Sequence, residues 1–171
     1  MRTERIEEEM KKLESKLEYK FNDISWLEKA MKSVKIKDIP NQGKNGKEYS
    51  NETLATVGDT ILKFVITDKL FKENESITKG ELTDFKKTLE SNKTLHKIMI
   101  EEHLIDYAYN DSNFHKDSKI KNNEKVVDKK HDPYLEAIIG AIYYDSKSDF
   151  VEVRNWINEW LFPRLEKYSK K

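Results

Sequence analysis

Four acidic residues lie at helical spacing in two otherwise apolar segments of the sequence. Glu52 and Asp59 are seven residues apart, which places them two turns apart on one face of a helix. Asp132 and Glu136 are one turn apart in a second helical segment. If the two helices pack together, these carboxylates converge in an apolar surround, where their repulsion requires a neutralising cation. Oxygen ligands without His or Cys suit Mg²⁺ or Mn²⁺, so the pattern predicts a divalent-metal site.

The four positions differ in how well a purely structural role explains them. Asp132 stands at the start of its helix, where capping is as good an interpretation as metal binding. Glu52 stands in a first turn, where its charge interacts favourably with the helix dipole, and that role explains it equally well. Asp59 and Glu136 are flanked by apolar residues, and a charge in such a place needs a partner. A metal ion is the favoured partner, and ion pairs with lysine are the alternative.

The segments that position these carboxylates are helical in their periodicity. A broad apolar stripe runs along the helix predicted for residues 51–71, so we expect that helix to be central. Gly58 lies beside Asp59 in this helix and weakens it, which predicts the close approach of another backbone there. Two polar stretches, residues 37–50 and 109–131, are predicted to be loops. The sequence predicts an all-α fold of about seven helices in a single domain over residues 1–171.

Composition limits the classes to which the protein can belong. The chain has 171 residues with 32 basic and 32 acidic side chains, so any surface for a polyanion must be a local patch. It has no Cys, which excludes disulfides and thiolate metal sites. No apolar run is long enough to span a membrane, and the charged N-terminus resembles no signal peptide. We therefore expect a soluble, cytoplasmic protein without membrane partners.

Five sequence blocks together resemble the ribonuclease III endonuclease domain, over about residues 13–168. In chain order they are LEYKFNDISWLEKAM, NETLATVGDTILKFVITDKLF, KGELTDFKKTLESNKTL, YLEAIIGAIYYDS and WINEWLFPRL. The resemblance implies an all-α homodimer that uses a divalent metal to cut double-stranded RNA in RNA processing. It is similar to the stand-alone members of the family, which lack a double-stranded-RNA-binding domain. Asp59 and Glu136 match the family's metal ligands directly, and Glu52 matches the acidic residue that opens the signature helix.

Three positions depart from the family pattern. The metal-binding Glu of the family falls on Ala55, and the aromatic residue that plugs the partner subunit falls on Thr56. The remaining acidic ligand falls on Pro133, although Asp132 is one position away. The resemblance therefore implies a metal site built from Asp59 and Glu136, completed by Asp132 and Glu52 directly or through water.

Two functions follow from this pattern, and a weaker third is a helical interaction module in which Asp59 and Glu136 form ion pairs with lysines. The first is a Mg²⁺- or Mn²⁺-dependent endoribonuclease that acts on double-stranded or structured RNA, with lysines holding the phosphates. The second is a catalytically silent homodimer of the same fold that binds structured RNA or a ribonucleoprotein. Ala55 and Pro133 motivate the second hypothesis. A homodimer is expected in both cases, because the apolar stripe of residues 51–71 exceeds what one small domain can bury.

Overall fold

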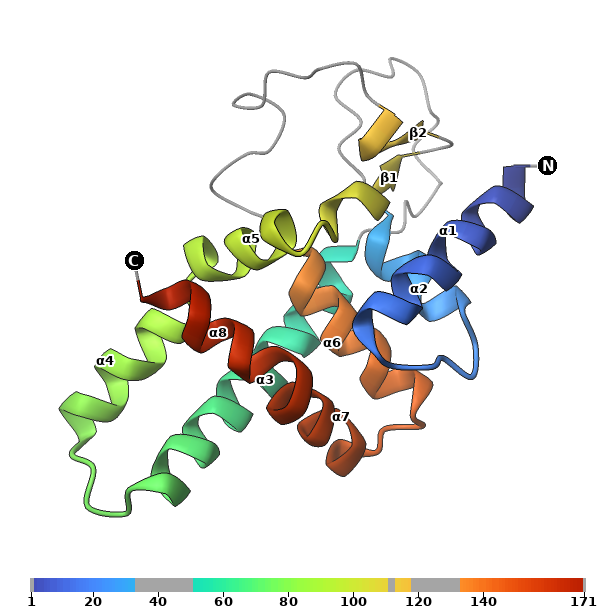
Figure 1. The fold of residues 1–171 in the computed structure, drawn as a ribbon. Coiled ribbons are helices and arrows are strands. Elements are labelled where there is room, and N and C mark those ends of the chain that lie inside the picture. Colours follow the sequence, from blue (N-terminus) through green and yellow to red (C-terminus); the bar gives the residue numbers. More distant parts are fainter. Residues whose placement is uncertain (1, 33–50, 111–112, 118–132, 171) are drawn as a thin grey trace, which may run out of the picture.

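The computed structural model describes residues 2–32, 51–110, 113–117 and 133–170. These residues are mainly helical, as predicted (Figure 1). In chain order the α-helices are α1 (Arg2–Leu17), α2 (Ser25–Met31), α3 (Asn51–Glu73), α4 (Lys79–Leu89), α5 (Asn92–Glu101), α6 (Tyr134–Asp145), α7 (Phe150–Trp156) and α8 (Phe162–Ser169). The expected all-α fold is confirmed. The segments 33–50 and 118–132 lie outside the described residues, and with them lie most of the two predicted loops.

The centre of the fold is the pair α3 and α6, which pack directly against each other (Figure 1). Two glycines allow their backbones to approach closely. A Cβ placed on Gly58 of α3 would lie 1.7 Å from the carbonyl oxygen of Glu136 in α6. A Cβ placed on Gly140 of α6 would lie 2.4 Å from the carbonyl oxygen of Leu54 in α3. The close approach predicted from Gly58 is therefore present, and the order of these contacts shows that the helices run antiparallel.

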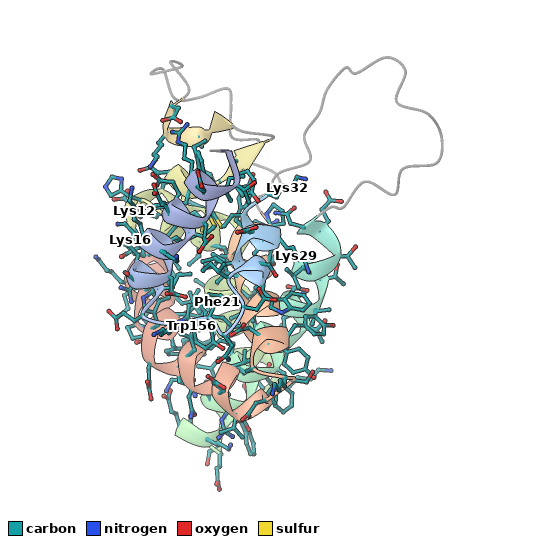
Figure 2. The ribbon with its side chains drawn as sticks, turned by 90° about the vertical axis from the view of Figure 1, so that its right-hand side faces the viewer. Lys12, Lys16, Phe21, Lys29, Lys32 and Trp156 are labelled. Carbon is teal, nitrogen blue, oxygen red and sulfur yellow. The ribbon has the colours of Figure 1, made fainter. Side chains whose placement is uncertain are left out.

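The N-terminal helix α1 is fixed to the C-terminal segment through two tryptophans. Trp156 and Trp160 stack with ring centroids 5.1 Å apart. The indole N–H of Trp156 donates to the carbonyl of Leu17 at 2.8 Å, and that of Trp160 donates to the carbonyl of Lys16 at 3.0 Å. Figure 2 looks onto this side of the molecule, with α1 and α2 in front. The tryptophans belong to the core and also satisfy the end of α1, where carbonyls lack a partner within the helix.

The C-terminal helical segment differs from the prediction. A proline such as Pro163 favours the end of a helix, but the chain stays helical to Ser169. A π-helical turn, Ile157–Leu161, separates α7 from α8, and Pro163 lies in the first turn of α8. The hydrogen-bond register of the helix changes at the π-helical turn, and such a change can accommodate a residue that has no backbone N–H.

The first part of the predicted 109–131 loop also differs from the prediction. Strands β1 (Tyr109–Asn110) and β2 (Asn113–Phe114) form a short antiparallel pair, which is the exception to an otherwise helical fold in the described residues. Phe114 is 1% exposed and its ring lies 5.5 Å from that of Tyr109. These two aromatic side chains belong to the core, although the polar composition of the segment predicted a loop.

None of the helices in the described part of the chain combines the length and the apolar character needed to cross a bilayer.

Candidate metal centre and the family it identifies

The crossing of α3 and α6 brings two of the predicted site residues to one place. Asp59 follows Gly58 directly, and Gly58 contacts the backbone of Glu136. Both acidic side chains are half-buried, at the edge of the core rather than inside it. Their positions follow from the glycine, because any larger residue at position 58 would push the helices apart. The crossing therefore fixes the two helix positions from which these carboxylates project.

A lysine pairs with one of the acidic side chains of this crossing. Lys63, one turn after Asp59 on α3, places its ammonium 2.7 Å from the Asp59 carboxylate. The hydrogen bond to Asp59 raises the pKa of Lys63, burial opposes that rise, and the charges of Asp59, Glu90 and Glu136 add to it. The ammonium of Lys63 is therefore paired with Asp59, and the negative charges of Glu90 and Glu136 influence it in addition. The alternative of an ion pair with lysine, considered from the sequence for Asp59, is present in the structure.

Glu90 is a further acidic residue whose charge acts on Lys63, and the sequence did not single it out. It is the residue at the C-terminal end of α4, directly after the buried Leu89. Burial raises the pKa of Glu90; the positive charges of Lys86 and Lys63 oppose the rise, and the negative charge of Asp59 adds to it. The Oε2 atom of Glu90 is buried and accepts no hydrogen bond from the described residues. The way α4 packs on α3 after the turn that joins them sets the position of this residue, and spacing along the chain does not predict that packing.

The other predicted site residues contribute differently. Glu52 is exposed in the first turn of α3. Ala55 is buried, one turn before Asp59, so α3 carries no carboxylate at that position. Asp132 lies outside the described residues. Within the parts of the chain that the structure describes, no three His, Asp or Glu side chains are arranged to hold a metal ion. A site that includes Asp132 stays a prediction.

A second buried carboxylate on α6 has a structural role. Asp145 is 5% exposed and accepts hydrogen bonds from the hydroxyl of Tyr19 at 3.0 Å and the backbone N–H of Asn22 at 3.0 Å. It also accepts from the N–H of Asp23 at 2.8 Å. These bonds satisfy the charge and hold the turn between α1 and α2 against the end of α6. The contrast with Glu90, which has a buried oxygen without a hydrogen bond, separates a structural carboxylate from one that needs a further partner.

An open apolar groove lies on another face of α3. Its volume is about 310 Å³, and the residues that line it come from α3, α6 and α7: Thr56, Val57, Thr60, Ile61, Tyr143 and Phe150. Beside it stands Phe64, which is 58% exposed and packs edge-on against Phe150 with ring centroids 5.5 Å apart. An aromatic side chain this exposed beside an apolar groove is typical of a surface that contacts another molecule.

More than half of the chain matches one known protein family. Residues 52–147, which extend from the first turn of α3 past the end of α6, match the family model described as the Ribonuclease III domain. The chain belongs to the ribonuclease III family. The resemblance seen in the sequence blocks is thereby confirmed. The crossing of α3 and α6, with Asp59 and Glu136, lies within the matched region.

Bacterial ribonuclease III enzymes are similar over most of this chain. It is 34% identical to Ribonuclease 3 of Vibrio cholerae over 92% of its own length and 62% of the relative. It is 32% identical to Ribonuclease 3 of Aliivibrio fischeri over 92% of its own length and 63% of the relative. The chain therefore spans about three fifths of the length of these ribonuclease III relatives.

Solved structures of ribonuclease III nuclease domains share the fold. One from Campylobacter jejuni is described as showing structural flexibility in the region involved in dimer formation. It matches with a TM-score of 0.67 and 27% identity, covering 92% of this chain and 96% of that one. A second structure of the Campylobacter jejuni nuclease domain matches with a TM-score of 0.66 and 26% identity, over 94% and 96% of the two chains.

Proposed function

We propose that this protein is a divalent-metal-dependent endoribonuclease that cleaves double-stranded or structured RNA during RNA processing. The observation that carries the proposal is the α3–α6 crossing, which sets Asp59 and Glu136 on adjoining helix positions within the region that matches the ribonuclease III domain. Relatives named Ribonuclease 3, at 34% and 32% identity, support the same activity class.

The residues at the crossing suit a hard divalent cation. Asp59 and Glu136 would hold the ion, with Asp132 and Glu52 completing the site directly or through water. The Oε2 atom of Glu90 is buried and accepts no hydrogen bond from the described residues. A positive charge nearby would stabilise this carboxylate as well. Mg²⁺ or Mn²⁺, when bound, supplies an activated water and stabilises the leaving oxygen.

The chain's own residues prepare this site in two ways. The carboxylates of Asp59 and Glu136 concentrate negative charge where the cation is needed. Lys63 neutralises part of that charge through its ion pair with Asp59. Lys63 must release the Asp59 oxygen for a metal to bind there, so metal affinity is set by competition between the two cations.

RNA would be held by lysines through its phosphates and 2′-hydroxyls, which makes recognition depend on shape rather than on sequence. The balanced total charge requires that these lysines act as local patches. Figure 2 shows four of them on the α1–α2 side: Lys12 and Lys16 lie along α1, and Lys29 and Lys32 lie along α2 and at its end.

A homodimer is part of the proposal. The groove on α3, α6 and α7 is apolar and open, and Phe64 stands exposed beside it. Thr56 lines this groove, which places the position of the family's aromatic plug on the same face. A second copy of the chain is the occupant that we propose, because the fold is shared with a nuclease domain described as dimer-forming.

Cleavage of a perfectly paired RNA of about thirty base pairs tests the activity. We expect cleavage with Mg²⁺ or Mn²⁺ and none after chelation. Because Ala55 removes one acidic ligand that the family pattern contains, we expect a millimolar-order metal requirement and a preference for Mn²⁺. Binding of the duplex without cleavage at any metal concentration would support the catalytically silent homodimer instead.

A further inference from the structure

Two aromatic rings stack at the surface where α2 packs against the end of α6. Trp26 of α2 and Tyr144 of α6 have ring centroids 5.3 Å apart and planes inclined by 20°. The Tyr143 ring meets Tyr144 edge-on, also with centroids 5.3 Å apart. Tyr144 is 38% exposed and Trp26 is half-buried, so the stack is part of the molecular surface. The apolar groove includes Tyr143 but neither ring of the stack, which therefore has no role in the sites described above.

Two lysines lie beside this stack. The Lys29 ammonium lies over the Trp26 ring, 4.3 Å from its centroid. Lys147 follows the end of α6, where its backbone N–H donates to the Tyr144 carbonyl at 3.1 Å, and it is exposed. Flat aromatic rings next to ammonium groups offer contacts to both parts of a nucleotide, because a base stacks on a ring and a phosphate pairs with a cation.

The aspartates near the stack already have backbone partners. Asp23 accepts from the N–H of Ser25 at 3.0 Å, and hydrogen bonds from Ser25, with a smaller effect of the Lys29 charge, lower the pKa of Asp23. Asp145 accepts from backbone N–H groups of the turn between α1 and α2. Asp149 caps α7 by accepting from two backbone N–H groups. The acidic groups are thus engaged by the fold, and the lysines give the surface of the stack a local positive charge suited to an anionic ligand.

A base can replace the ammonium that covers Trp26. Stacking of a base on an aromatic side chain is generally stronger than an exposed contact between a cation and a ring. The displaced Lys29 side chain is long and flexible, so its ammonium can pair with the phosphate of the same nucleotide. A base inside a perfect duplex already stacks on its neighbours. The nucleotide that fits this surface is therefore an unpaired one.

We propose that Trp26 and Tyr144, with Lys29 and Lys147, bind an unpaired nucleotide of the RNA substrate. The inference rests on the proposed RNA-cleaving function and narrows its substrate class to structured RNA in which an unpaired nucleotide lies near a duplex. Tyr144 lies two turns after Glu136 on α6, about 12 Å along the helix axis. A nucleotide on the stack and a phosphate at the candidate metal site can therefore belong to one RNA molecule.

Tryptophan fluorescence detects a nucleotide on this stack without any cleavage. Trp156 and Trp160 are buried, so quenching by an added oligonucleotide reports mainly on Trp26. A short single-stranded oligoadenylate is titrated, with a chelator present, into the parent protein, Tyr144→Ser, Tyr144→Phe and Phe85→Ser. We expect saturable quenching in the parent protein and binding about tenfold or more weaker in Tyr144→Ser. Tyr144→Phe keeps the ring and should stay within about twofold of the parent.

Phe85→Ser is the matched control. Phe85 is an exposed aromatic residue followed by two lysines, but it makes no ring contact with the rest of the described residues. We expect this variant to bind oligoadenylate within about twofold of the parent. An abasic oligomer of the same length keeps the phosphates and lacks the bases. As a competitor of oligoadenylate for the parent protein, it should be about tenfold or more weaker than unlabelled oligoadenylate.

Three results would overturn the stacking site: no quenching in the parent protein, equal oligoadenylate affinity in the parent and Tyr144→Ser, or equal competition by the abasic oligomer. Normal oligoadenylate binding by Tyr144→Ser together with a weaker dimer in sedimentation velocity would place the stack in a subunit interface instead. Cleavage of a perfect duplex separates this inference from the proposed function. Tyr144→Ser should cleave that duplex at the parent rate, whereas a parent protein that cleaves no RNA would contradict the proposed function itself.

Discussion

At the scale of single residues, two ion pairs on α3 have the same local geometry and different surroundings. Lys63 pairs with Asp59, and Lys72 pairs with Asp68, each over one helical turn with 2.7 Å between nitrogen and oxygen. Lys63 also has Glu90 and Glu136 among the charges that act on it. Exposed pairs of this kind contribute little to stability. The difference between the two pairs is therefore expected in metal binding rather than in folding.

Replacing Lys63 tests the competition between lysine and metal. We expect Lys63→Gln to raise Mn²⁺ affinity roughly tenfold, which is about 1.4 kcal/mol, because the competing positive charge is removed. Lys72→Gln should leave the affinity unchanged. Isothermal titration calorimetry of both variants measures the effect. Weaker Mn²⁺ binding in Lys63→Gln would show that the lysine supports the site rather than competing with the ion.

At the scale of elements, the crossing of α3 and α6 depends on two small residues. Gly58 and Gly140 each place a backbone hydrogen where a side chain would meet a carbonyl of the opposite helix. Backbone atoms cannot rotate away as a flexible side chain can, so a larger residue must separate the helices. The same contact sets the positions of Asp59 and Glu136. A substitution that separates the two helices is therefore expected to change both the stability of the fold and the geometry of the proposed metal site.

Substitution of Gly58 measures how tightly the crossing is packed. We expect Gly58→Ala to destabilise the fold by about 3 kcal/mol or more, the upper range for overpacking, because the new Cβ would lie 1.7 Å from the Glu136 carbonyl oxygen. Gly80→Ala is the matched control, since nothing lies within 4 Å of a Cβ at that helical position. It should change stability by no more than about 1 kcal/mol, in the stabilising direction. Urea unfolding followed by circular dichroism compares the two, and equal stabilities would contradict the close packing.

The sequence predicted the elements of this fold better than their meeting points. Gly58 could be interpreted correctly because a helix-weakening residue within an apolar stripe requires a packing reason. The continuation of the helix past Pro163 could not be predicted, because a π-helical turn that accommodates proline has no clear sequence signal. Asp59 and Glu136 could be singled out from their apolar neighbours. Glu90 could not, because its position depends on how α4 packs against α3, which the spacing of residues does not predict.

At the scale of the whole molecule, the exposed apolar face predicts assembly. Phe64 lies two turns after Thr56 on α3 and leaves most of its ring in solvent beside the groove. Burying such a ring on association contributes about 1.5–3 kcal/mol. An aromatic residue at position 64 can thereby compensate for the missing aromatic residue at position 56.

Oligomeric state tests this surface. We expect the protein to be a dimer by sedimentation velocity, and Phe64→Ser to weaken the dimer about tenfold or more. Phe85→Ser is the control, because Phe85 is equally exposed, at 57% against 58%, but lies on α4 away from the groove. A monomeric parent protein at high micromolar concentration, or equal effects of the two substitutions, would contradict a dimer built on this face.

We propose that the carboxylates at the α3–α6 crossing bind the metal with which the protein cleaves duplex RNA. The most direct measurement is the cleavage rate of a fluorescent RNA duplex with Mn²⁺ for the parent protein, Asp59→Asn and Asp68→Asn. The two variants remove the same charge from the same helix, and each breaks an ion pair of the same length. We predict that Asp59→Asn abolishes cleavage, while Asp68→Asn keeps the parent rate. Undiminished cleavage by Asp59→Asn would contradict the account.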